Sequence, residues 1–170
     1  SSDLWDRAGD VYIGIGHVNL VLEEEMEPIG FFKSTAGPMV VDFLPPRDAR
    51  LLQTRPIAER TVIAMYLNNR AVESLTRGQL DDAYWWARAA LRSDPELRGA
   101  YVTLGVVYRA RHRPDLSEAA LARVAEREPD NTYAMSNRIL ALRDLGRDDE
   151  AGRLAARLAQ LDPHPPYSYF

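Results

Sequence analysis

The segment that decides the fold is residues 101–108, with the sequence YVTLGVVY. On either side of it, prolines next to an aspartate recur every 34 residues, at Pro95, Pro129 and Pro163. The same step of 34 residues relates a set of turn positions and a set of small residues: Gly78, His112 and Gly146, and Ala83, Ser117 and Ala151. A turn residue, a small residue and a proline in this order are typical of a helix end, a close contact between two helices and the start of the next pair. The period therefore predicts consecutive helical hairpins, and His112 is expected to adopt the left-handed turn conformation of the glycines.

Residues 101–108 resemble the tetratricopeptide pattern of an aromatic residue, two spacers, Leu-Gly, two spacers and Tyr. The flanking repeats match less closely, with Leu67, Arg70, Ala71 and Ser74 in the first and Met135, Arg138, Ile139 and Leu142 in the third. Ile139 stands where a small residue normally lets two helices touch, while Ala87 and Ala155 stand where a large aromatic is expected, so we expect a compensating exchange of volumes. The resemblance implies a domain of residues 51–163, with about six helices in repeats at 64–97, 98–131 and 132–163.

Tetratricopeptide hairpins stack into a solenoid whose first helices line a concave groove that binds a peptide or protein. By this resemblance, the groove-facing candidates are Met65, Asn68, Val72 and Leu75 in the first repeat, Val102, Val106 and Arg109 in the second, and Tyr133, Ser136, Leu140 and Arg143 in the third. Chaperone-binding members hold a C-terminal carboxylate with Lys, Arg and Asn side chains, but Val72 and Val102 stand where such residues are needed. A mostly apolar groove is therefore expected, occupied either by an external protein segment or by the chain's own N-terminal segment or tail.

Residues 84–86 place three aromatic side chains, Tyr-Trp-Trp, next to one another on one predicted helix. Adjacent residues of a helix do not share a side, so at least one ring is expected to point away from the hairpin core. It marks either a docking surface or ordinary packing with one exposed ring. The tail, residues 164–170, is too short and proline-rich for the polar helix that usually closes a solenoid. A homo-oligomer through the β segment, Trp85 and Trp86, or the tail is one way to cover the last helix.

Residues 1–50 have a β-like pattern, with short β-branched or alternating runs at 11–15, 17–22 and 39–44 bounded by Gly and Pro. They predict a small antiparallel sheet, and prolines at 45, 46 and 56 mark the passage to the helical part. The expected fold class is therefore α+β, mostly α.

Two residues of this β segment, His17 and Asp42, lie 25 residues apart on separate predicted strands. The arrangement resembles the C-terminal half of a transglutaminase-like domain, in which a histidine and an aspartate on successive strands follow a cysteine on an upstream helix. The resemblance implies that His17 is the base and that Asp42 orients its imidazole. The chain has no cysteine, so this alternative, a cysteine protease or acyltransferase, needs a nucleophile upstream of Ser1. The other reading makes both residues ordinary polar residues at sheet edges.

The composition argues against several other classes of function. A total of 21 Lys and Arg against 25 Asp and Glu gives a net charge of −4, without the basic excess of a nucleic-acid-binding protein. No run approaches about 18 consecutive apolar residues, so a membrane span is not expected. The histidines are scattered and no phosphate-binding glycine motif is present, so neither a metal nor another cofactor is expected. The sequence predicts a protein-interaction module rather than an enzyme and leaves its cellular location undetermined.

Overall fold

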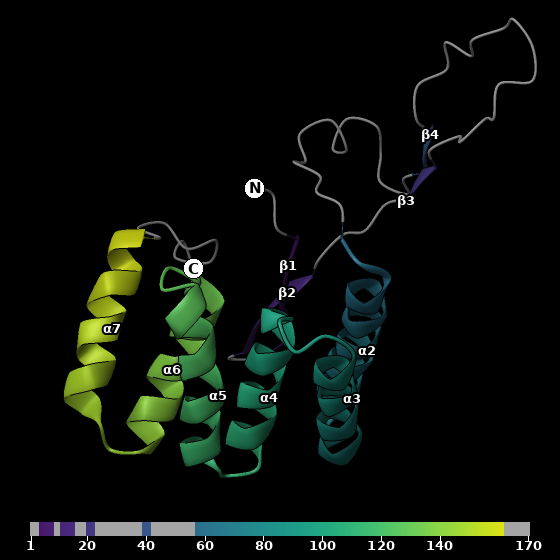
Figure 1. Cartoon of the computed structure of the whole chain (residues 1–170). Coiled ribbons are helices and arrows are strands. Elements are labelled where there is room, and N and C mark those ends of the chain that lie inside the picture. The colour runs from purple at the N-terminus through teal and green to yellow at the C-terminus, as the bar shows by residue number, and fades with distance from the viewer. Residues whose placement is uncertain (1–3, 9–10, 16–19, 23–38, 42–56, 162–170) are drawn as a thin grey trace, which may run out of the picture. The chain divides into compact units, whose positions relative to one another are not determined.

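Six helices form the main body of the protein. The computed structural model describes residues 57–161 in full and, as backbone, residues 4–8, 11–15, 20–22 and 39–41. The helices are α2 (Glu59–Thr76), α3 (Leu80–Ser93), α4 (Arg98–Ala110), α5 (Pro114–Arg127), α6 (Thr132–Asp144) and α7 (Asp148–Leu161). They form three hairpins, α2 with α3, α4 with α5 and α6 with α7, which follow one another along the chain (Figure 1). The predicted number of helices and their pairing into hairpins are confirmed.

The predicted α+β fold class is wrong. Within residues 57–161 every regular element is a helix and there is no strand. The strands that the structure describes are β1 (Leu4–Ala8), β2 (Val11–Ile15), β3 (Leu20–Leu22) and β4 (Met39–Val41). They pair only two by two, β1 with β2 and β3 with β4, both antiparallel, instead of forming the expected small sheet. An isolated two-stranded pair is marginally stable in water, so the packed helices set the fold class.

The chain divides into two compact units. One consists of residues 1–3 and 16–56, and the other of residues 4–15 and 57–170. The β1–β2 hairpin therefore belongs to the helical unit, although a long segment of the other unit separates it from α2 in the sequence. Within the helical unit, β2 contacts α6 and α4.

The three hairpins close the contact between their two helices with different volumes. In the second hairpin, a Cβ added to Gly105 would lie 2.7 Å from Cγ of Leu121, so α4 and α5 touch through a glycine and a leucine. In the third, the large residue is on the first helix, and Ile139 packs in a cluster with Ala155. The exchange of volumes predicted for the third repeat is therefore confirmed.

The helix-connecting turns repeat the same backbone geometry. Gly78, His112 and Gly146 have φ angles of 74°, 57° and 71°, in the left-handed region. The residue after each of them donates its N–H to a carbonyl in the last turn of the preceding helix, for example Arg113 to Tyr108 at 2.9 Å. This pattern satisfies helix-end carbonyls and favours glycine at the turn position. The predicted left-handed conformation of His112 is confirmed.

Replacing His112 with glycine is expected to stabilise the protein by about 0.5–1 kcal/mol, because a Cβ in the left-handed region costs energy that glycine avoids. Thermal unfolding followed by circular dichroism measures the effect. His112→Ala is the control, since it removes the imidazole and keeps the Cβ. Equal stability of the two variants would show that backbone strain is not the cause of the gain.

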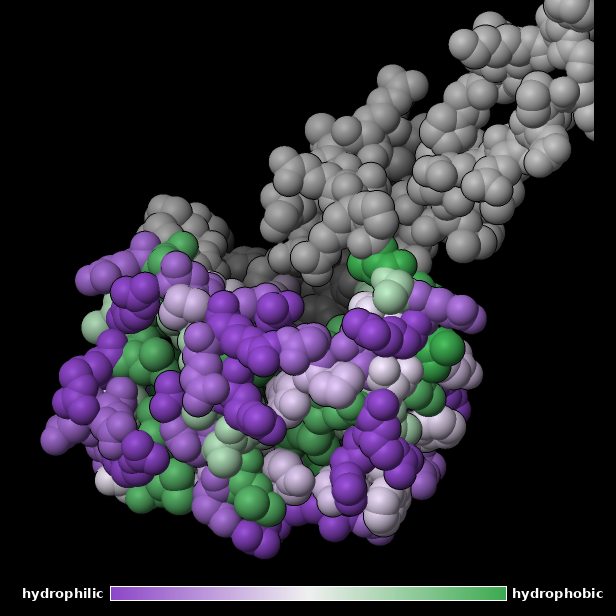
Figure 2. All heavy atoms as spheres, viewed as in Figure 1, coloured by the Kyte–Doolittle hydropathy of each residue, from purple (hydrophilic) through white to green (hydrophobic). Residues whose placement is uncertain are grey.

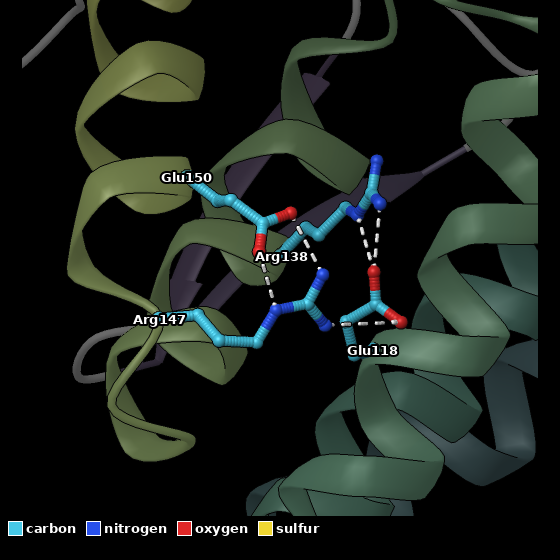
Figure 3. A network of polar contacts seen from close by, with 4 residues as sticks. All are labelled: Glu118, Arg138, Arg147 and Glu150. Carbon is cyan, nitrogen blue, oxygen red and sulfur yellow. Dashed lines mark hydrogen bonds and ion pairs between the residues drawn. The ribbon is translucent and has the colours of Figure 1, made fainter.

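A charged network connects α5, α6 and α7 (Figure 3). Arg138 donates to Oε1 of Glu118 from Nε at 3.0 Å and from Nη2 at 2.7 Å. Arg147 lies 4.0 Å from the other oxygen of Glu118 and donates two hydrogen bonds of 2.7 Å to Glu150. These bonds hold the pKa of the Glu150 carboxyl below its usual value. Arg138 stands where the repeat pattern has leucine, and its partner Glu118 on the neighbouring hairpin accounts for that departure.

Candidate binding face

The first helices of the three hairpins are neighbours in space, because α4 contacts both α2 and α6. They carry an aliphatic residue at the same repeat position, Val72, Val106 and Leu140, each 34 residues from the next. None of the three belongs to the hydrophobic clusters through which the described helices pack. We call the side of α2, α4 and α6 that bears these residues the first-helix face.

On α4 the candidates divide between this face and the core. A helix turns about 100° per residue, so Val106 points well away from Gly105, the residue that faces α5. Val106 is nonetheless only 6% exposed. Val102, by contrast, packs in a cluster with Leu121, Val124 and Ala134 between the second and third hairpins. The structure thus places Val102 in the contact between hairpins and Val106 on the first-helix face.

The candidates on α2 include a buried amide. Met65, Val72 and Leu75 are half-buried, whereas Asn68 is 8% exposed. Its Oδ1 accepts no hydrogen bond from the part of the chain that the structure describes. A Cβ added to Gly99 on α4 would be 3.6 Å from Nδ2 of Asn68, so the amide lies where α2 meets α4. A buried acceptor without a donor is unfavourable, and an N–H group of a ligand would relieve it.

The polar candidates near α6 are partly engaged within the protein. Nε of Arg109 donates to Oδ2 of Asp144 at 2.6 Å, which connects α4 to α6. The hydroxyl of Ser136 donates to the carbonyl of Thr132 at 2.8 Å. Arg143 is exposed and forms no ion pair within residues 57–161. The remaining two candidates are half-buried: Tyr133, which packs against the cluster containing Val102, and Leu140. The face is therefore mainly apolar, with Arg143 as its exposed cation.

An extended segment lies against part of this face. The helices that β2 contacts, α6 and α4, are both first helices. Thr103 and Val106 on α4 are only 5% and 6% exposed, although Val106 belongs to no helix–helix cluster. The neighbouring strand accounts for the burial of Val106.

The aromatic run lies apart from the first-helix face, on the second helix α3. Trp85 is 57% exposed, which confirms that one ring points away from the hairpin core. The guanidinium of Arg88 lies 5.6 Å from the ring centres of both Trp85 and Tyr84, and Arg70 lies 5.9 Å from that of Trp86. On the side of the helices seen in Figure 2, hydrophobic patches are separated by hydrophilic residues. The predicted homo-oligomer through Trp85 and Trp86 stays a prediction.

The proposed catalytic pair, His17 and Asp42, lies outside the described residues, as does the tail at 164–170. The described residues contain no group of His, Cys, Asp or Glu side chains suited to a metal ion. Their helices include none that is both long and apolar enough to cross a membrane.

Comparison with known proteins adds no assignment. No protein-family model matches the chain, and no curated protein matches its sequence. The candidate face is therefore described by its own residues alone.

Sequence reasoning missed the strand β1 and the common step of Val72, Val106 and Leu140. Residues 9–10, Gly-Asp, separate two runs and are a typical two-residue hairpin loop, so this signal was available for β1. Comparing groove positions across repeats, rather than within each repeat, would have shown the aliphatic row.

Proposed function

We propose that the chain is a tetratricopeptide-like protein-interaction module that binds an extended protein segment on the first-helix face. The observation that carries this proposal is the row of Val72, Val106 and Leu140, which recurs with the period of the repeats and takes no part in helix–helix packing. A hydrophobic row that the core does not use favours contact with another polypeptide. The row runs across three consecutive first helices, so a ligand lying along it crosses the hairpins.

The surroundings of the row favour recognition of an apolar segment over capture of a chain terminus. The exposed cation is Arg143, while Arg109 is already paired with Asp144, so a set of free cations for a terminal carboxylate is missing from the described part of this face. Asn68 offers a buried acceptor, and a ligand main-chain N–H is a suitable donor for it. Apolar side chains seated along the row supply affinity, and a hydrogen bond to Asn68 orients the ligand.

The test is selection of peptides from a displayed library of random 12-residue sequences on the full chain. Binding of a selected peptide is then compared for the wild type, Val72→Asp and Leu140→Asp. Each carboxylate should weaken binding at least tenfold, because a charge must be desolvated beneath an apolar side chain. Ala119→Asp, at an exposed position of α5, is the matched control and should bind like the wild type.

Circular dichroism must first show the same helix content in all four proteins. Selected peptides that bind Val72→Asp and Leu140→Asp as well as the wild type contradict the proposal. Loss of binding in Trp85→Ala instead would place the binding surface on α3.

A further inference from the structure

The β1–β2 hairpin of this chain is an intramolecular ligand of the first-helix face, we propose, and an external ligand has to displace it. This inference rests on the proposed function and specifies its partner as an extended strand with aliphatic residues at alternate positions. The hairpin then sets the threshold for capture of a partner.

Three observations place the hairpin on this face. β2 and the helices belong to one compact unit, while residues 16–56 form another. The helices that β2 contacts, α6 and α4, carry Leu140 and Val106 of the aliphatic row. Val106, the middle residue of the row, is 6% exposed without belonging to a helix–helix cluster. Its cover is therefore an element other than the described helices, and β2 is the element in contact with α4.

The length of β2 suits this position. Val11 and Ile15 are four residues apart, and a strand rises about 3.3 Å per residue, so they are about 13 Å apart. Packed helices lie about 8–10 Å from axis to axis. The strand is therefore long enough to cross two neighbouring first helices and too short to cross three, in agreement with its contacts to α4 and α6.

The sequence of β2 defines the partner. Alternate residues of a strand lie on the same side, and in β2 one alternating set is Val11, Ile13 and Ile15. An aliphatic row on the strand thus meets an aliphatic row on the helices. Because the hairpin is tethered, its effective concentration is on the order of millimolar, and a free strand with similar side chains binds the full chain poorly. The face accordingly favours partners that present more apolar contacts than β2 does.

Crosslinking tests the position of the hairpin, and the absence of native cysteine removes any background. Full chains carrying Ile13→Cys with either Val106→Cys or Leu140→Cys are treated with a short bismaleimide. Both pairs are expected to give an intramolecular crosslink in most molecules. Ile13→Cys with Arg88→Cys, an exposed position on α3, is the control and should crosslink at least tenfold less. Equal crosslinking of all pairs, none at all, or products of twice the chain mass would overturn the intramolecular arrangement, the last by showing exchange between copies.

Competition tests the consequence for binding. The probe is a fluorescein-labelled synthetic peptide of residues 1–16, and its anisotropy is measured with full chains. The variant Ile13→Asp, which weakens the tethered hairpin, should bind the probe at least tenfold more tightly than the wild type. Adding Leu140→Asp should remove this gain. Tyr12→Asp, which changes the other side of the strand, is the control and should leave the affinity within about threefold of the wild type.

The two experiments separate this inference from the proposed function. Crosslinking without any binding of the probe to Ile13→Asp would leave the hairpin in place and contradict the use of the face for a second strand. Library peptides that need Val72 and Leu140, together with failed crosslinking, would support the function and overturn the resident hairpin.

Discussion

The variant Gly105→Ile is expected to lose about 3 kcal/mol of stability, because there is no room for a side chain between α4 and α5. A Cβ at this position lies 2.7 Å from Cγ of Leu121 and 3.0 and 3.1 Å from its two methyl carbons. Leu121 is fully buried, so it has little space into which to retreat. Overpacking of a well-filled core costs about 1–3 kcal/mol, and isoleucine adds more atoms than one Cβ. Urea unfolding followed by the helical circular dichroism signal measures the loss.

The third hairpin supplies the remedy, since it holds isoleucine and alanine at the equivalent positions 139 and 155. Leu121→Ala alone should cost about 2–5 kcal/mol by leaving a cavity. Combined with Gly105→Ile it should recover at least half of the summed loss, because the new side chain fills the space that the leucine vacates. Losses that simply add would contradict the exchange of volumes. Gly152→Ala is the control: nothing lies within 4 Å of its added Cβ, so helix propensity should stabilise that variant by about 0.5–1 kcal/mol.

Reversing the charge of Glu118 is expected to cost about 2 kcal/mol. Its side chain is 16% exposed and pairs with Arg138, which is 26% exposed, while Arg147 lies nearby. Glu118→Lys places a third cation beside these two guanidinium groups, and Arg138 also loses its acceptor. The pair is half-buried rather than fully buried, which keeps the cost below that of a fully buried ion pair. Urea unfolding at low and high salt measures the cost, which should shrink as salt screens the repulsion.

Glu126→Lys, at an exposed position of the same helix, is the matched control and should change stability by less than about 0.5 kcal/mol. The charge-swapped double variant, Glu118→Lys with Arg138→Glu, should recover part of the loss. No recovery would indicate that the side-chain volume at position 118, and not the ion pair, maintains this contact between hairpins.

Much of the helical fold could be predicted because its signals are local and periodic. The step of 34 residues placed the hairpins, and the equivalence of His112 with two glycines predicted its left-handed backbone. The pairing of Ile139 with Ala155 also followed, because both residues depart from one pattern in complementary directions. The fold class did not follow. The runs in residues 1–50 have strand character, but strand propensity does not show whether enough strands pair to make a sheet.

The candidate face shows the same limit. Val102 and Val106 look alike in sequence, yet Val102 lies between hairpins and Val106 on the first-helix face. The distinction depends on the rotation of α4 relative to its neighbours, which arises from the packing of whole helices. The partnership of Glu118 and Arg138, on different hairpins, depends on the same packing.

The sequence by itself determined the repeating unit of this protein: its period, its helix ends and the residues that face each other inside a hairpin. These depend on interactions within about 34 residues, which local periodicity records. The tertiary structure alone decided which apolar residues the core leaves over and that β2 lies beside α4 and α6. The reason is that contacts between segments far apart in the chain depend on how whole elements fit together, and no local pattern encodes that fit.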